Sequence, residues 1–274
     1  ELESFAFVKN DVKEKDLIVK PPLRFRLSDY RALADEIAGD LKSDTKRGER
    51  ARQWYDETLK KYKKSNYYVL TWPEYMQELS KLTNKVVTYV KNKKVSIDAV
   101  VPILRGGNIP ATFLAYTLDI LTILPVQYKY FFIPGKCQLR RLLSINQTFI
   151  TKENPVFLLV EGNHCYGNQA KYAAKDLKAA FPHCSIIYGA SNMDYNYQRV
   201  VEDAEVSFYG NLTNCCKELS DAECKKLGIE YSRELLFPWE KVNEEWKIVK
   251  LKQHPYVNVN EIIAHSPLVA EYDL

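Results

Sequence analysis

Residues 98–107 read Asp-Ala-Val-Val-Pro-Ile-Leu-Arg-Gly-Gly, an apolar run that ends in an arginine and two glycines. A continuous run of aliphatic residues is typical of a strand that is buried on both faces, as in a parallel sheet. Residues 156–160, Val-Phe-Leu-Leu-Val, form a second such run, and Glu161 and Gly162 follow it. The two stretches predict buried parallel strands, each followed by a polar loop.

Stretches with helical periodicity alternate with these apolar runs. Apolar residues recur every three to four positions in residues 72–91, 110–118 and 170–180, whereas residues 67–71, 123–133, 185–189, 205–209 and 235–239 have strand character. This alternation predicts an α/β fold, a mostly parallel sheet flanked by helices, over residues 67–240.

The two ends of the chain differ from this pattern. Residues 1–27 look irregular, and the helical periods that follow predict a helical hairpin, so residues 1–66 are expected to form an N-terminal helical extension. Residues 241–274 are expected to form a C-terminal tail that packs on the core. We expect the N-terminal helices to offer a surface for a protein partner or for a second copy of the chain.

Composition excludes several classes of protein. Hydrophobic residues make up 46% and charged residues 27%, which is the balance of a globular chain and not of a disordered one. The net charge of +4 is too small to indicate nucleic-acid binding. The most apolar stretch, residues 109–126, is interrupted by Asp119 and two prolines, so no membrane span is expected. The six cysteines match neither a disulfide framework nor a zinc motif, and we expect reduced thiols, a cytoplasmic location and no zinc.

Two polar segments follow the buried strands, where ligands bind in parallel sheets. In the first, Gly106 and Gly107 let the backbone approach an anion, and the Arg105 guanidinium suits phosphate oxygens. The alternative is a tight turn that needs glycines for its backbone alone. The second segment runs into a helix, where amide groups bind phosphate. Its candidate ligand-binding residues are Glu161, Gly162, Asn163, His164, Cys165, Tyr166, Gly167, Asn168 and Gln169.

With these segments, the chain resembles the type I phosphoribosyltransferases, above all the small purine-type and archaeal members, over residues 67 to about 240. The likeness also includes Leu70-Thr71-Trp72, Phe208-Tyr209-Gly210 and Phe237-Pro238-Trp239-Glu240. The resemblance implies a site for a phosphorylated ribose in which Arg105 and Glu161 are catalytic, Trp239 stacks on a base and Mg²⁺ assists. It assigns no metal ligands, and packing is an equally good interpretation of Trp239.

The chain departs from the family pattern at several positions. Gly162 replaces the second of two acids that hold the ribose, and Tyr166 and Gln169 replace hydroxyl residues of the phosphate turn. Residues 190–193 lack the lysine that contacts a purine. Restoring the acid with Gly162→Asp is expected to strengthen ribose binding if Tyr166 leaves room.

Other polar groups have more than one interpretation each. His164 and Cys165 form either a nucleophile pair or a small, partly buried structural pair. Asp194 and Glu240 either supply a general base, or hold magnesium, or are solvated acids.

Two functions therefore stay open. We favour a divergent phosphoribosyltransferase-like enzyme that binds a phosphorylated ribose or a nucleotide and transfers a pentosyl group to or from an aromatic base. The alternative is a non-catalytic nucleotide-binding or scaffold protein that retains the fold.

Overall fold

The computed structural model describes residues 6–8, 68–133, 136–195, 200–213, 219–231, 235–240 and 258–273. The chain divides into two compact units, the first made of residues 1–21, 71–128 and 143–232 and the second of the remaining residues. The predicted N-terminal helical hairpin lies outside the described residues. Within the stretch that we expected to be irregular, Ala6–Val8 form a strand, β1, because they pair with a later strand.

The sheet of the first unit is mostly parallel, as predicted. Its strands follow the order β1-β8-β7-β6-β3-β4, in which β3 (Ala99–Leu104), β6 (Val156–His164), β7 (Ser185–Asp194) and β8 (Val206–Thr213) are parallel to their neighbours. The start of β4 (Val126–Ile133) pairs in parallel with β3, and β1 is antiparallel to β8. The central strands are almost completely buried, which explains the continuous apolar sequences of β3 and of the first half of β6.

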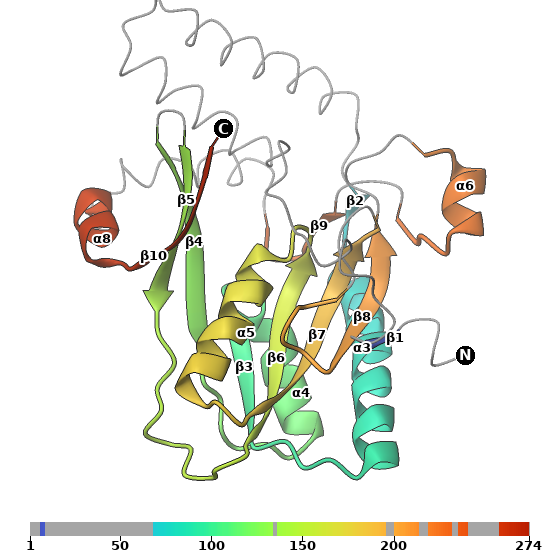
Figure 1. Ribbon diagram of the computed structural model, residues 1–274. Helices are drawn as coiled ribbons and strands as arrows, with labels where there is room; N and C mark the ends of the chain where they lie inside the picture. Colours follow the sequence, from blue (N-terminus) through green and yellow to red (C-terminus); the bar gives the residue numbers. More distant parts are fainter. Residues whose placement is uncertain are drawn as a thin grey trace, which may run out of the picture. The chain divides into compact units, whose positions relative to one another are not determined.

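Two helices connect these strands in opposite directions along the sheet. From β3 the chain passes through α4 (Asn108–Thr117) to β4, the neighbour of β3 on the side away from β6. From β6 it passes through α5 (Asn168–Ala180) to β7, the neighbour of β6 on the side away from β3 (Figure 1). Since such crossovers are right-handed, the two helices cover opposite faces of the sheet. The direction of winding reverses between β3 and β6, which makes this boundary a topological switch point.

Helix α3 (Trp72–Lys93) covers the β7 and β8 side of the sheet. It begins with a capping box, in which the Thr71 hydroxyl accepts a hydrogen bond from the Glu74 amide and the Glu74 carboxylate accepts one from the Thr71 amide. The predicted apolar face of the helix is confirmed, with these side chains fully buried: Tyr75, Leu79, Leu82 and Val86.

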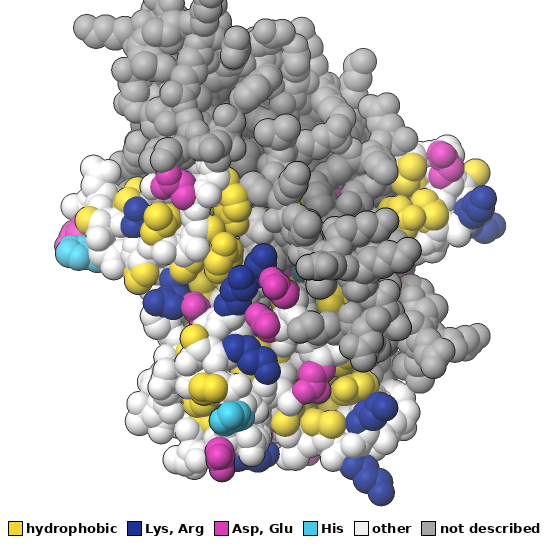
Figure 2. All heavy atoms as spheres, viewed as in Figure 1, with side chains coloured by type: hydrophobic (Ala, Val, Ile, Leu, Met, Phe, Trp, Pro, Cys, Tyr) yellow, Lys and Arg dark blue, Asp and Glu magenta, His cyan; other side chains and the backbone are white. Residues whose placement is uncertain are grey.

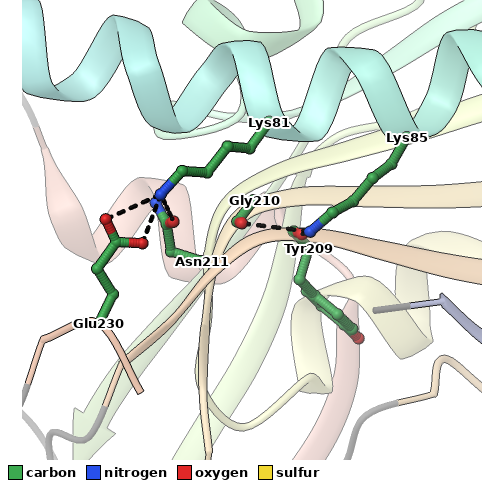
Figure 3. Close-up of polar contacts among 6 residues, drawn as sticks. All are labelled: Lys81, Lys85, Tyr209, Gly210, Asn211 and Glu230. Atoms are coloured by element: carbon green, nitrogen blue, oxygen red, sulfur yellow. Dashed lines mark hydrogen bonds and ion pairs between the residues drawn. The ribbon is translucent and has the colours of Figure 1, made fainter. Parts of the chain in front are cut away.

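Two lysines of α3 lie over the edge of β8 (Figure 3). Strand β1 pairs only with Val206–Phe208. Beyond that point Lys85 Nζ donates to the Tyr209 carbonyl oxygen at 2.6 Å. Lys81 Nζ donates to Asn211 Oδ1 at 2.9 Å and to Glu230 Oε2 at 2.6 Å. Lys85 thus pairs with backbone carbonyl groups of β8, and charged side chains beside a strand discourage pairing with other chains.

The second unit contains elements that the sequence did not predict. Strand β5 (Lys136–Leu143) pairs antiparallel with β10 (Leu268–Asp273), and α8 (Val259–His265) precedes β10. The short strands β2 (Tyr68–Val69) and β9 (Leu235–Leu236), which lie within two segments predicted to have strand character, pair in parallel. Helix α6 (Asp221–Lys226), in the first unit, was also not predicted.

Two expectations from composition can be compared with the described residues. No helix among them is both long and apolar enough to cross a membrane. None of their cysteines, at positions 137, 165, 184 and 224, is part of a disulfide.

Candidate functional site at the switch point

The first candidate segment is a tight turn between β3 and α4. Arg105 and Gly106 are exposed, whereas Gly107 is buried, with a φ of −73°. A Cβ at residue 107 would lie 2.3 Å from the Val160 carbonyl oxygen and 2.7 Å from that of Ile103. Close packing against the sheet, and not a left-handed backbone, therefore requires a glycine at this position. The turn leaves the Arg105 side chain at the surface beside the switch point.

The sequence predicted that the second candidate segment is a loop from Glu161 onward, and this prediction is wrong. Strand β6 continues to His164, because residues 161, 163 and 164 stay in register with Ala190, Asn192 and Met193 of β7. Glu161, Gly162, Asn163 and His164 are therefore strand residues at the carboxyl end of the sheet. Strand β7 likewise extends beyond the predicted Gly189 to Asp194.

The structure brings the two segments together. A Cβ on Gly162 would lie 2.7 Å from the Gly106 carbonyl oxygen and 3.1 Å from the Gly106 Cα. This contact confirms that the Arg105 turn and the end of β6 share one edge of the sheet. It contradicts the expectation for Gly162→Asp, since the backbone of Gly106 occupies the space that a side chain needs.

Glu161 is held by Tyr188, which the sequence did not indicate as a site residue, and Tyr188 is bonded in turn to His164. The Tyr188 hydroxyl donates to Glu161 Oε2 at 2.6 Å, and His164 Nδ1 lies 2.8 Å from the same hydroxyl oxygen. Burial, followed by the charge of Glu161, raises the pKa of Tyr188 well above its usual value. The only signal for Tyr188 was a polar tip within the apolar run 185–189.

The helix that follows β6 has a glycine and a buried asparagine at its N-terminus. Gly167 has a φ of +69°, and Asn168 starts α5 with 2% of its surface exposed. Asn168 Nδ2 has no hydrogen-bond partner among the described residues. An unpartnered buried donor beside free helix amides suits an anion.

The other residues of this segment have local partners or partial exposure. Asn163 Nδ2 donates to the Cys165 sulfur at 3.4 Å, and Gln169 Nε2 donates to the Tyr128 carbonyl oxygen at 3.4 Å. Tyr166 is half-buried. The ring of His164 is 1% exposed and bonds through Nδ1 to Tyr188, which agrees with a structural role for this histidine.

Three candidates remain, Asp194, Trp239 and Glu240. Asp194 is completely buried, so the interpretation of a solvated acid is wrong. Trp239 and Glu240 belong to the second unit. There Trp239 stacks on Phe237 at a centroid distance of 4.9 Å, and Glu240 Oε2 accepts a hydrogen bond from the Phe237 amide. The base-stacking role of Trp239 stays a prediction.

Charge on the visible face is mixed. Figure 2 shows lysine and arginine side chains of the described residues interspersed with aspartate and glutamate, instead of gathered in one patch. A nucleic-acid surface usually concentrates basic residues on one face or stripe.

Comparisons with known proteins agree with this fold. No family model and no curated protein matches the chain. Among solved structures, a hypothetical protein from Neisseria gonorrhoeae with bound ppGpp is similar at 14% identity and a TM-score of 0.50, covering 69% of this chain and 98% of that one.

Two enzymes are also similar to the chain. Purine phosphoribosyltransferase from Pyrococcus horikoshii has 17% identity and a TM-score of 0.44, covering 64% of this chain and 95% of its own. Helicobacter pylori xanthine-guanine-hypoxanthine phosphoribosyltransferase has 15% identity and a TM-score of 0.42, covering 69% and 100%. The similarity at a TM-score of 0.50 agrees with the α/β fold described above, a mostly parallel sheet flanked by helices.

Proposed function

We propose that this protein binds a phosphorylated ribose or a nucleotide at the switch point between β3 and β6 and transfers a pentosyl group to or from an aromatic base. The observation that carries the proposal is the contact of Gly106 with Gly162, which joins the Arg105 turn to Glu161. Switch points are where open α/β sheets bind ligands. Arg105 is the candidate for the leaving phosphates and Glu161 for the ribose.

The transition state of a pentosyl transfer has a cationic sugar and a departing anion, so catalysis is mainly electrostatic. The guanidinium of Arg105 would stabilise the departing phosphates, and the Glu161 carboxylate the sugar. The N-terminus of α5, with Asn168, would hold the phosphate on the ribose. The site would work in the cytoplasm, where thiols such as that of Cys165 stay reduced.

Mg²⁺ fits this site as a companion of the ligand. No group of three His, Cys, Asp or Glu side chains that could hold a metal occurs in the described part of the chain. Mg²⁺ commonly binds through one or two carboxylates together with substrate phosphates, which it neutralises. Glu161 would be the carboxylate that holds such an ion together with the phosphates of the ligand.

One observation favours the second candidate, a nucleotide-binding protein without turnover. The backbone of Gly106 fills the space where the second family acid would stand, so the ribose would have one carboxylate instead of two. Such a protein would bind the same ligands but release no product. ppGpp is a suitable probe because the gonococcal structure contains it.

Titration calorimetry tests binding, and pyrophosphate release tests turnover. The probes are pyrophosphate, ribose 5-phosphate, nucleoside monophosphates, ppGpp and phosphoribosyl pyrophosphate, each with and without Mg²⁺. Arg105→Ala should weaken binding roughly 10- to 100-fold, as expected for a charge-assisted hydrogen bond. Lys93→Ala is the matched control, since Lys93 is exposed at the end of α3 that leads into β3.

The outcomes separate the candidates. Binding together with base-dependent release of pyrophosphate supports the transferase, and binding without release supports the second candidate. A folded protein that binds none of the probes would overturn both.

A further inference from the structure

We infer that Tyr188 and His164 are positioning residues, which hold Glu161 so that its oxygen Oε1 accepts a hydrogen bond from a ribose hydroxyl. This inference deepens the proposed function and rests on it for the identity of the ligand. It starts from a row of hydrogen bonds across two neighbouring strands, His164 and Glu161 on β6 and Tyr188 on β7.

The direction of each hydrogen bond in this row follows from the chemistry of Tyr188. Its hydroxyl is fully buried beside a carboxylate, and both conditions keep it protonated. A tyrosine has one O–H to donate, and the carboxylate of Glu161, 2.6 Å away, accepts it. The hydroxyl oxygen must therefore accept from His164, which places a proton on Nδ1.

The packing around the row leaves little freedom. The rings of His164, Tyr188 and Tyr209 are in contact, with centroid distances of 5.4 Å from His164 to each tyrosine. On the other side, a Cβ at Gly167 would lie 2.9 Å from the His164 ring atom Cε1. The imidazole is thus confined between the α5 turn and the aromatic pair.

In this arrangement the two carboxylate oxygens of Glu161 have different surroundings. Oε2 is taken by Tyr188. Within the described residues no hydrogen bond reaches Oε1, and the side chain is 12% exposed. A carboxylate fixed through one oxygen offers the other in a defined direction, which a freely rotating glutamate does not do. With Gly162 in the place of a second acid, Glu161 is the carboxylate of β6 that this orientation makes available for a ribose hydroxyl.

Selectivity for ribose over 2-deoxyribose is the readout that a merely structural role would not change. The probes are ribose 5-phosphate and 2-deoxyribose 5-phosphate, measured by calorimetry. We expect the wild type to prefer the ribose compound by about tenfold, since a hydroxyl that donates to a carboxylate forms a charge-assisted bond. Tyr188→Phe and His164→Leu should reduce this ratio to about one or two.

Two further variants are the controls. Tyr75→Phe removes the hydroxyl of another buried tyrosine, which bonds to Ser191 at 3.1 Å, and should leave the ratio unchanged. His164→Asn keeps an N–H donor near the position of Nδ1 and should retain most of the preference. The inference would be overturned if Tyr188→Phe had the same ratio of affinities for ribose 5-phosphate and 2-deoxyribose 5-phosphate as Tyr75→Phe.

Nitrogen-15 NMR of the histidines tests the row without any ligand. The chain has four histidines, so His164→Asn identifies the His164 signal. We expect Nδ1 to carry the proton in the wild type and Tyr188→Phe to weaken this preference. A proton on Nε2 alone in the wild type would overturn the inference. The expected tautomer, without binding of either sugar phosphate, would support the order of the row and contradict the proposed function.

Discussion

Gly162 packs against the backbone of Gly106, so that a Cβ at residue 162 would lie 2.7 Å from the Gly106 carbonyl oxygen. Gly106 follows β3 and Gly162 lies inside β6, and these two strands are parallel neighbours. Their contact lets the Arg105 turn approach Glu161. It also explains why this chain has no acid at residue 162: the space is filled by main chain.

Gly162→Ala should destabilise the protein by about 1–3 kcal/mol, the usual cost of overpacking, and Gly162→Asp by more, since its charge would also be crowded. Urea unfolding measures both. Gly106→Ala is the control, because a Cβ at residue 106 would have no neighbour closer than 3.8 Å. Equal stability of the two alanine variants would show that the contact is not tight in solution.

Lys85→Met should destabilise the protein by about 1–3 kcal/mol, because it leaves the Tyr209 carbonyl at the β8 edge without its charged donor. Burial lowers the pKa of Lys85 to about 8, so the amine is still charged at neutral pH. Lys81→Met should cost less than about 1 kcal/mol, since its ion pair with Glu230 is solvent-exposed. Urea midpoints in a common buffer compare the variants, and a larger loss for Lys81→Met would contradict the interpretation.

The sequence predicted the fold where one physical signal dominated. The buried strands 99–104 and 156–160 have continuous apolar sequences, and the helix 72–93 has both a regular apolar face and a capping box. These local signals agree with the packing of the folded chain, so the predicted bounds of β3 and α3 lie within a few residues of the observed ones.

The missed elements depend on partners that are distant in sequence. β6 and β7 continue through polar residues, because Asn163 and Asn192 pair in register and Glu161 bonds to Tyr188. β5, with Arg140 in its interior, exists beside β10, which begins more than a hundred residues later. For the site, the sequence indicated the Arg105 turn and Glu161, but the Gly106 contact and the Tyr188 bond exist only in three dimensions.

Glu78→Gln should make the protein more stable at neutral pH than the wild type. Burial under α3 raises the pKa of Glu78 to about 7, and the side chains of Tyr231 and Asn192 offset only part of this effect. Neither carboxyl oxygen has a hydrogen bond of ordinary geometry within the described residues. Ionising this group in the folded state therefore costs free energy, on the order of 3 kcal/mol.

The sign of the pH dependence follows from the raised pKa. Between its ordinary value of 4.5 and about 7, the folded protein binds more protons at Glu78 than the unfolded chain does, so stability falls as the pH rises through this range. We expect urea unfolding from pH 4.5 to 8 to show a free energy of unfolding that is higher for the Gln variant than for the wild type. This difference should increase up to about pH 7 and stay constant above it. Glu153→Gln, at an exposed position, is the control, and parallel curves for Glu78→Gln would contradict the shift.

Asn168→Ala should affect binding and stability differently. Asn168 is buried at the start of α5, and its Nδ2 has no partner among the described residues. A buried donor without a partner costs about 1–3 kcal/mol, so its removal offsets much of the cavity that alanine creates. We expect the free energy of unfolding to stay within about 1 kcal/mol of the wild-type value.

The same substitution should weaken the binding of ribose 5-phosphate by about 2- to 10-fold, which corresponds to one neutral hydrogen bond to the phosphate. Asn192→Ala is the matched control: Asn192 is also a buried asparagine without a hydrogen bond of ordinary geometry in the described structure, but it lies in β7 beside Glu78 and not at the helix N-terminus. Calorimetry and urea unfolding on the same samples measure both effects. If Asn192→Ala weakened binding as much as Asn168→Ala, the phosphate would not be held at the start of α5. If Asn168→Ala bound normally but lost several kcal/mol of stability, Asn168 would be a purely structural residue.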